Sequence, residues 1–257
     1  VDLVQDAVSQ GFKNIICVGG DGTFHNSING LMTFKKTILP EVALGVIPVG
    51  TGNDWVKTHD IPKKIEKAIQ IIKRGRIKQQ DVGFISFLNS KDKAVYFNNL
   101  AGIGFDGHVV KKVNKYKRFG ALAYIIGALF GLFSFKNFYA SVFVNGNTIN
   151  TKSLMVLIGL CRYSGGGMQL TKDIDPSDGL FDISIAKNFS KLEIIKSLGK
   201  LFNGKIVDNK KVDTYKSSYI KIEVNNKEQI PVQADGELIG SGSFEIKLIP
   251  NAICFYH

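Results

Sequence analysis

Two glycine-rich segments are the residues of this sequence best suited to bind phosphate. Gly19-Gly20-Asp21-Gly22-Thr23 follows the apolar run 15–18 and opens a stretch with helical character, and Gly50-Thr51-Gly52-Asn53-Asp54 follows the strand-like run 43–49. Glycine lets the backbone come close to a ligand, and the N–H groups at the start of a helix attract anions. We expect the two loops to face one nucleotide.

The first loop differs from the common phosphate-binding motifs because it carries an acid, Asp21. It lacks the Gly-Lys-Ser/Thr of a P-loop and the Gly-x-Gly-x-x-Gly of a Rossmann turn. A carboxylate beside phosphate is repulsive unless a cation or ordered water lies between them, so Asp21 favours magnesium bound together with the phosphates. An ordinary turn is the alternative interpretation of either loop taken alone.

Three later segments appear in a fixed order after these loops. They are Phe97-Asn98-Asn99-Leu100-Ala101-Gly102-Ile103-Gly104-Phe105-Asp106, Asp175-Pro176-Ser177-Asp178-Gly179-Leu180-Phe181-Asp182 and Gln233-Ala234-Asp235-Gly236-Glu237. With the two glycine loops, their order and spacing resemble the diacylglycerol kinase catalytic-domain family, which includes bacterial soluble lipid kinases and the sphingosine and ceramide kinases. The resemblance extends from about Val1 to the C-terminus.

This resemblance implies an enzyme that uses ATP and Mg²⁺ to transfer the γ-phosphoryl group to the hydroxyl of diacylglycerol or a related lipid alcohol. The nucleotide would contact Gly19, Gly20, Asp21, Gly22, Thr23, Phe24, His25, Gly50, Thr51, Gly52 and Asn53. NAD kinase shares Gly-Gly-Asp-Gly-Thr and is the closest alternative, although the second glycine loop and the late Asp-Gly-Glu argue against it. An inactive regulatory nucleotide-binding homologue is the third possibility.

The catalytic base is expected in Asp235-Gly236-Glu237. In an extended stretch, residues two apart point to one face, and Gly236 would leave room for a substrate. By the resemblance, this segment supplies the base; we favour Asp235 as base with Glu237 as its support, and the assignment between the two stays open. The alternative is a plain turn, because Asp-Gly is a common turn dipeptide.

Two ion sites follow from the resemblance. Asp21, Asp54 and Asp81 would hold the catalytic Mg²⁺, partly through water, and Asp175, Asp178 and Leu180 would hold a structural cation. Magnesium keeps several waters, so acids can act on it through solvent. The alternatives are a helix cap at Asp54, a solvated strand end at Asp81 and a turn at 175–180.

The sequence departs from the family pattern in two places. The strand and Asn-Pro-x-Ser-Gly loop that open the pattern are not found before Asp2, so we expect the sequence to lack that first segment and its nucleotide contacts. The family's Gly-Thr-x-Asn-Glu reads Gly22-Thr23-Phe24-His25-Asn26 here. We expect His25 to be a hydrogen-bonding member of the loop and not a base, because no partner carboxylate lies near it in sequence.

The pattern of elements predicts two domains, an α/β nucleotide-binding domain over 1–82 and a mainly antiparallel β-sandwich over 83–257, with the last strand possibly returning to the first domain. Helices are expected at 22–32 and 62–74 and a strand at 43–49. Further strands are expected at 82–88, 94–101, 138–144, 154–160, 180–186, 219–224, 230–234 and 244–249. Asn145-Gly146 predicts a hairpin turn.

Composition favours anionic partners without naming one. The chain has 257 residues, 33 basic and 22 acidic side chains and a net charge of +11. Nucleic acid is not expected, because the aromatic residues alternate within strand patterns and no RNP-type or helix-turn-helix motif is found. Cys17, Cys161 and Cys254 stand singly in apolar runs, which predicts buried thiols in a cytoplasmic protein.

The uncharged run 119–135 follows a basic cluster. It is marginally short for a membrane span and contains three glycines, so we expect either a core helix or the lining of a lipid entrance. In the second case the cluster would bring a peripheral enzyme, possibly a homodimer, to an anionic membrane surface. The cluster consists of Lys111, Lys112, Lys115, Lys117 and Arg118.

Overall fold

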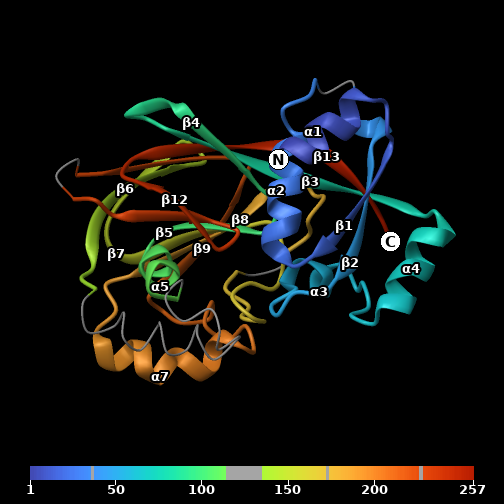
Figure 1. The fold of residues 1–257 in the computed structure, drawn as a ribbon. Coiled ribbons are helices and arrows are strands. Elements are labelled where there is room, and N and C mark those ends of the chain that lie inside the picture. Colours follow the sequence, from blue (N-terminus) through green and yellow to red (C-terminus); the bar gives the residue numbers. More distant parts are fainter. Residues whose placement is uncertain (36–37, 114–134, 172–173, 226–227) are drawn as a thin grey trace.

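The computed structural model describes residues 1–35, 38–113, 135–171, 174–225 and 228–257. It has an α/β region at the N-terminal end and a larger, mainly antiparallel β region (Figure 1). Both parts of the predicted fold class are therefore confirmed. The predicted run 119–135, together with Lys115, Lys117 and Arg118, lies outside the described residues except at Phe135.

The α/β region is built on two parallel strands, β1 (Asn14–Gly19) and β2 (Ala43–Pro48), which pair from Asn14↔Ala43 to Gly19↔Pro48. Because parallel strands end at the same edge, the two glycine loops that follow them are brought together. Around the strands lie α1 (Asp2–Ser9), α2 (Asp21–Leu31), the 3₁₀ turn η1 (Leu39–Glu41), α3 (Asp54–Thr58) and α4 (Ile65–Arg74).

The β region extends the same sheet by antiparallel pairing. Strand order is β1-β2-β13-β10-β6-β7-β5-β11-β12, with β3 beside β13 and β4, and β8 beside β7 and β9. The strands are β3 (Ile77–Phe87), β4 (Ser90–Phe97), β5 (Leu100–Gly104), β6 (Phe138–Val144), β7 (Asn147–Gly159), β8 (Phe181–Lys187), β9 (Val212–Ser217), β10 (Tyr219–Val224), β11 (Pro231–Ala234), β12 (Glu237–Ser241) and β13 (Phe244–Tyr256). Two helices accompany them, α5 (Phe105–Val113) and α7 (Lys191–Leu201).

Most predicted elements are present, but the structure differs from the prediction in several places. The strand predicted at 94–101 is two strands, β4 and β5, because the chain turns at the buried residues Asn98 and Asn99. The elements that were not predicted include β9, β12, α3, α5 and α7. Asn145 and Gly146 have φ of 50° and 74°, so the hairpin turn between β6 and β7 is confirmed.

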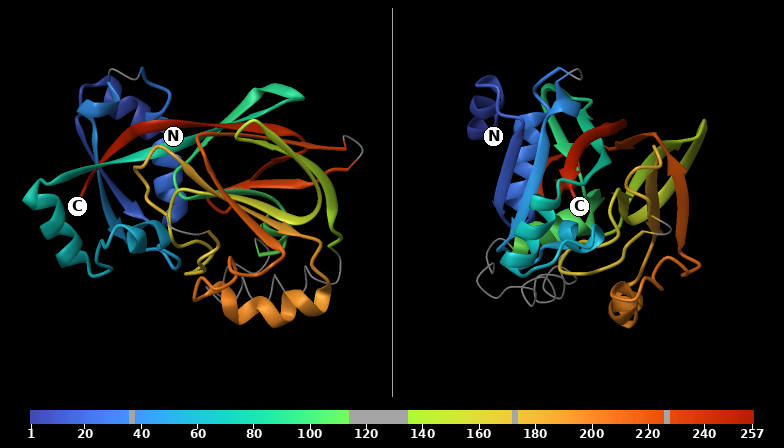
Figure 2. Two further views of the ribbon diagram at one scale, coloured as in Figure 1. Left: turned by 180° about the vertical axis from the view of Figure 1, so that it is seen from behind. Right: turned by 90° about the vertical axis from the view of Figure 1, so that its right-hand side faces the viewer.

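Strand β13 links the two regions. Both of its halves pair with β3, its first half also pairs with β10, and Cys254 and Phe255 pair in parallel with Ala43 and Leu44 of β2. Figure 2 shows this red strand running from the β region into the α/β region. Ala252, Ile253 and Phe255 are buried in the hydrophobic cluster formed mostly by residues of the α/β region.

A second large cluster fills the β region. It contains the inward-facing residues of its strands, among them Phe97, Phe138, Phe181 and Phe244. Within the part of the chain that the structure describes, no helix is long and apolar enough to cross a membrane.

Candidate active site

The two glycine loops touch each other. A β-carbon on Gly50 would lie 2.5 Å from Cα of Gly20, and one on Gly20 would lie 3.0 Å from Cα of Gly50. The backbone N–H of Val49 donates to Gly19 O at 3.0 Å, and the amide Nδ2 of Asn53 donates to Gly50 O at 2.6 Å. The predicted pairing of the loops is thus present, and glycine is required here for backbone contact between the loops.

The predicted nucleotide residues divide by exposure. Thr23 and Thr51 are exposed on the loops, where a ligand can reach them. Phe24 is buried, with its ring centroid 4.0 Å from that of Trp55. Phe24 therefore packs α2 against Trp55 in the core, and its side chain does not reach the surface of the loop.

Asp21 and Asp54 lie side by side at the start of short helix α3. The Asp21 carboxylate accepts the backbone N–H of Asp54 at 3.1 Å and that of Trp55 at 3.2 Å. Asp54 is buried and accepts from Lys57 Nζ at 2.7 Å and from Gly166 N at 2.6 Å. Burial raises the pKa of Asp21 despite the two N–H donors, and the nearby charges of Asp54 and Asp235 raise it further.

Asp81 lies in a different environment from this pair. Its carboxylate is fully buried and accepts from Asn251 N at 2.7 Å and from Gly179 N at 2.8 Å. The acids whose charges act on it are Asp178 and Asp175. Asp81 therefore anchors the 175–180 loop to β3 and β13, and the structure does not group it with Asp21 and Asp54.

The 175–180 loop is held by hydrogen bonds from the protein itself. Asp175 Oδ1 accepts from Ser177 N and Ser177 Oγ, and Asp178 Oδ1 accepts from Leu180 N at 3.0 Å. The other oxygen of Asp178 contacts Lys216 Nζ at 2.8 Å, so an ammonium group supplies positive charge beside it. No group of three or more metal-ligating side chains is found in the described ranges.

Asp235 and Gly236 form a two-residue turn between β11 and β12. Their φ angles of 49° and 82° are both positive, as the tightest hairpin turns require, and Asp-Gly suits that geometry. The prediction of an extended stretch with Asp235 and Glu237 on one face is therefore wrong. The turn separates the two acids into different surroundings.

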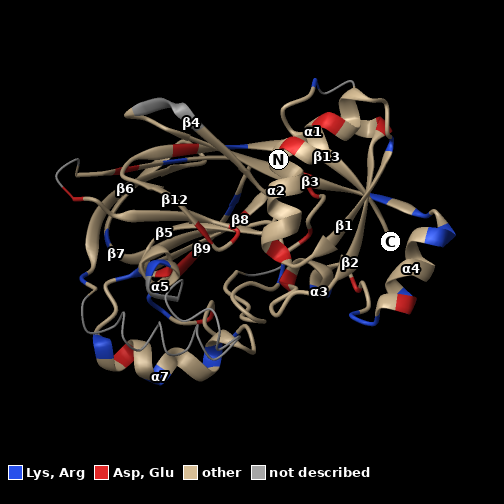
Figure 3. Cartoon of the chain, in the orientation of Figure 1, with Lys and Arg blue, Asp and Glu red and all other residues tan. Residues whose placement is uncertain are grey.

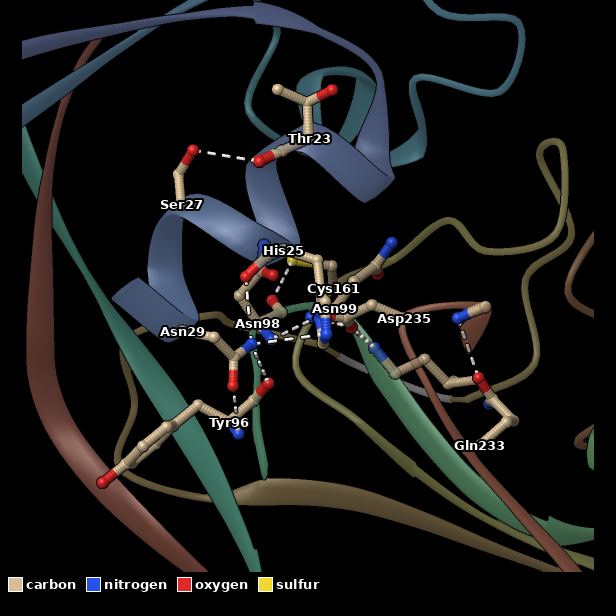
Figure 4. Close-up of polar contacts among 12 residues, drawn as sticks. Thr23, His25, Ser27, Asn29, Tyr96, Asn98, Asn99, Cys161, Gln233 and Asp235 are labelled. Carbon is tan, nitrogen blue, oxygen red and sulfur yellow. Dashed lines mark hydrogen bonds and ion pairs between the residues drawn. The ribbon is translucent and has the colours of Figure 1, made fainter. Parts of the chain in front are cut away.

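The Asp235 side chain is buried and receives hydrogen bonds from several segments. Its carboxylate accepts the backbone N–H groups of Asn98, Asn99 and Leu100 at 2.9–3.0 Å. A fourth contact, 2.8 Å, comes from Nδ1 of His25 (Figure 4). A carboxylate so enclosed positions the hairpin and is a poor proton acceptor for a substrate.

His25 has a carboxylate partner after all, but one 210 positions away in the chain. It belongs to α2, as does Asn29, whose amide lies 3.3 Å from Nε2 of His25. Burial lowers the pKa of His25, but the hydrogen bond and charge of Asp235, with the charge of Glu237, raise it overall above its ordinary value. His25 therefore ties α2 to the Asp-Gly-Glu hairpin.

Glu237 is exposed, unlike Asp235, and begins β12. Its Oε1 would lie 3.9 Å from a β-carbon on Gly22, so its carboxylate faces the glycine-rich start of α2. Of the two acids in the Asp-Gly-Glu segment, Glu237 is thus the one that a substrate beside the phosphate loop can contact.

Asp106 is a candidate that the sequence analysis quoted but gave no role. Its Oδ2 accepts from Gln233 Nε2 at 3.0 Å, while its Oδ1 is shielded from solvent and has no hydrogen-bond partner among the described residues. Burial raises the pKa of this carboxyl to about 6, although the Gln233 hydrogen bond opposes the rise. In the sequence, the available signal was an acid at the end of the run 97–106. In the structure, Gly102 lies beside its carboxylate.

Asp106 lines a cavity of about 290 Å³ in the β region. The wall is almost entirely apolar and is formed by strands β5, β7, β8 and β9 together with α5 and α7. Gln233 also lines it, and its Oε1 accepts from Gly236 N at 2.9 Å. Leu100, a third lining residue, donates its N–H to Asp235 and accepts the N–H of Asp235. The cavity therefore ends at the residues that hold the Asp-Gly-Glu hairpin.

Comparison with known proteins agrees with this geometry. Residues 1–85 match the model of the diacylglycerol kinase catalytic domain, and residues 99–257 match that of the YegS C-terminal NAD kinase beta sandwich-like domain. The chain is 30% identical over 254 residues to diacylglycerol kinase of Mycobacterium tuberculosis (strain H37Rv), covering 98% of this chain and 79% of the relative. It is 29% identical over 239 residues to diacylglycerol kinase of Bacillus subtilis (strain 168), covering 92% and 75%.

A solved structure shares the fold. The crystal structure of a diacylglycerol kinase from Bacillus anthracis str. Sterne superposes with a TM-score of 0.74 at 22% identity, over 100% of this chain and 80% of that one. Together with the two family matches and the site geometry, these relatives show that the chain belongs to the diacylglycerol kinase family of lipid kinases.

Proposed function

We propose that this protein is an ATP- and Mg²⁺-dependent kinase that transfers the γ-phosphoryl group to the hydroxyl of diacylglycerol or a related lipid alcohol. The observation that carries the proposal is the apolar cavity of about 290 Å³ that ends at Gln233 and Leu100, the residues that hold the Asp-Gly-Glu hairpin. Such a cavity suits acyl chains, and its inner end would place a hydroxyl near Glu237. The polar dinucleotide that NAD kinase phosphorylates has no complementary surface there.

The nucleotide phosphates are assigned to the touching glycine loops. The N–H groups at the start of α2 point away from the helix and carry its positive dipole end, and Thr23 and Thr51 supply exposed hydroxyls. The close backbone contact between Gly20 and Gly50 holds the two loops in a fixed position relative to each other.

Mg²⁺ is assigned to Asp21 and Asp54, whose carboxylates lie next to these loops. A β-carbon on Gly52 would lie 2.9 Å from Asp21 Oδ2 and 3.9 Å from Asp54 Oδ2, so both acids border one small space. Two carboxylates are enough because Mg²⁺ keeps several waters and takes phosphate oxygens as ligands. The ion would neutralise charge on the phosphates during transfer.

Glu237 is our choice of general base, in place of Asp235. It is exposed beside the start of α2, whereas the four donors around Asp235 stabilise its carboxylate and occupy it. In this assignment Glu237 accepts the proton of the lipid hydroxyl, and Asp235 with His25 holds the hairpin that carries Glu237. Peripheral contact with an anionic membrane, from the cytoplasmic side, would deliver the lipid.

The test is Glu237→Gln, assayed for phosphate transfer from radiolabelled ATP to a panel of lipids that includes diacylglycerol, with NAD as a further acceptor. Loss of a general base typically lowers the rate by about 10²–10⁴. We expect that loss on a lipid, with ATP affinity measured by calorimetry unchanged. Glu66→Gln on α4, also exposed, is the matched control and should keep full turnover.

Three outcomes would contradict parts of this proposal. Turnover of Glu237→Gln above half that of the parent would remove the assignment to Glu237. Phosphorylation of NAD in preference to every lipid would make the protein an NAD kinase. ATP binding without transfer to any acceptor would support the inactive regulatory homologue.

A further inference from the structure

Helix α7 is fixed to the β region at both ends. At its start, Ser190 and Glu193 form a reciprocal capping box, in which Ser190 N donates to Glu193 Oε2 at 2.8 Å and Glu193 N donates to Ser190 Oγ at 3.3 Å. Lys211 Nζ contacts Glu193 Oε1 at 2.7 Å. At its end, Gln169 N donates to Leu201 O at 2.7 Å. These contacts set which side of the helix faces outward.

The inner side of α7 closes the apolar cavity. Ile194, Ser197, Leu198 and Leu201 line it, and their spacing of three and four residues places them on one side of the helix. The cavity that we assign to acyl chains is thus separated from the exterior on this side by a single helix. Figures 1 and 2 show α7 at the outer edge of the molecule, beyond the strands.

The outer side of α7 is apolar as well. Leu192 is 70% exposed, Ile195 49% and Phe202, the residue that follows the helix, 46%. Helical spacing of three residues places Leu192 and Ile195 on one side, whereas Phe202 also lines the cavity and lies at the border between the two sides. A helix whose apolar residues face both a cavity and the outside differs from an ordinary surface helix, which keeps charged residues outward.

The charges on this outer side are basic. Lys191, Lys196 and Lys200 are exposed on α7, and Lys205 is exposed just beyond it (Figure 3). Glu193 is the only acid within the helix, and its carboxylate is engaged by Ser190 and Lys211. Apolar residues flanked by lysines are complementary to one kind of surface, the headgroup region of an anionic membrane.

We propose that α7 is the element through which this protein docks on anionic lipid, with Leu192 and Ile195 entering the headgroup region and Lys196 and Lys200 beside them contacting lipid phosphates. This inference rests on the proposed lipid kinase function. The docked helix would hold the adjoining cavity against the bilayer, so that a lipid could pass from the membrane to Glu237 without crossing water. Leu192 and Ile195 do not line the cavity, so substituting them leaves its wall unchanged.

The test is binding to vesicles of phosphatidylcholine with about one third phosphatidylglycerol, measured by co-sedimentation at low salt. The double variant Leu192→Ser/Ile195→Ser should bind at least about tenfold more weakly, because it loses the inserted apolar area. Lys196→Gln/Lys200→Gln should also bind about tenfold more weakly, and its deficit should shrink at high salt. Turnover of a short-chain lipid in detergent should stay at the parental rate in both.

Helix α4 supplies a matched control. It too carries exposed isoleucines, Ile65 and Ile69, next to exposed lysines such as Lys64 and Lys67, but it lines no part of the cavity. Ile65→Ser/Ile69→Ser should change vesicle binding less than about twofold. Melting temperatures of all variants check that the folds are intact, and the lysine variant repeats the test should the serine variant unfold.

The outcomes separate docking from function and from self-association. Parental vesicle binding by both α7 variants, or an equal loss in the α4 control, overturns the proposal. A change in sedimentation coefficient with unaltered vesicle binding assigns the outer side of α7 to a second copy of the chain and likewise overturns it. If the α7 variants lose binding while the parent phosphorylates no lipid, docking stands and the kinase function fails.

Discussion

The hairpin end of the site and the apolar cavity behind it place the same chemical group, an aspartate carboxylate, in opposite surroundings. Asp235 accepts three backbone N–H groups and contacts His25. Asp106 has Gln233 on one oxygen and no partner on the other among the described residues. Gln233 contacts both regions, since its Oε1 accepts from Gly236. One region is ordered by dense polar contacts, and the other is left apolar and loosely satisfied.

Under the proposed function, this difference explains how one sheet would serve two ligands. Groups that position phosphate must not move, and backbone hydrogen bonds between distant segments provide that rigidity. A cavity for acyl chains needs shape and apolarity, and a polar group in its wall is costly unless it can shed its charge. Substitutions around Asp235 and around Asp106 test this difference between the two regions.

The largest effect is expected for Asp235→Ala. Removing the carboxylate leaves several N–H groups and His25 without their acceptor, which should lower the free energy of unfolding by about 3–5 kcal/mol. Asp178→Ala is the control, because its partner Lys216 is partly exposed and such pairs contribute about 1 kcal/mol or less. Urea denaturation measures both. Equal losses would mean that Asp235 is no more important to stability than a surface acid.

The next largest effect is expected for Gly50→Ala, which should lower the free energy of unfolding by about 3 kcal/mol. The added β-carbon would lie 2.5 Å from Cα of Gly20 in the opposite loop. That backbone cannot move away without displacing the two glycine loops from each other. Gly199→Ala in α7 is its counterpart, since no atom lies within 4 Å of the new carbon and alanine favours helix. That variant should gain about 0.5–1 kcal/mol. Thermal melts of the two variants should shift in opposite directions; a shift in the same direction would contradict the comparison.

The smallest effect depends on pH. The pKa of Asp106 is raised to about 6, so its contribution to stability is complete below about pH 4 and is lost as pH rises through 6. Asp106→Asn cannot ionise and should therefore be more stable than the parent at pH 7.5, relative to pH 4.5, by about 2 kcal/mol. Asp208→Asn, an exposed acid, should show no such difference. An unchanged pH dependence in Asp106→Asn would show that this carboxyl ionises freely.

Local patterns predicted the parts of the site that depend on neighbours in sequence. Strand, glycines and helix in succession located the two glycine loops, and Asn145-Gly146 located a hairpin. The capping residues Ser190 and Glu193 were an available signal for α7, which was nonetheless missed. The pairing of His25 with Asp235 could not be predicted, because it arises only when α2 packs against the hairpin.

The roles of the acids were less accessible. The spacing of Asp235 and Glu237 fits a strand as well as a turn, and only the positive φ angles decide between them. The roles of Asp81 and Asp106 likewise could not be predicted from the sequence. Whether a carboxylate faces an ion, a backbone N–H or an apolar cavity is set by tertiary packing, which a residue type and its position do not specify.

The course of β13 has a consequence for how this chain folds during synthesis. Ala252, Ile253 and Phe255 complete the hydrophobic cluster of the α/β region, and Cys254 pairs with Ala43 of β2. Strand β2 therefore pairs with a segment that lies much later in the chain, so the first region cannot complete its sheet before the second region has been made. The glycine loops that follow β1 and β2 would therefore acquire their final geometry only after β13 has paired with β2, which couples the order of these loops to the folding of the β region.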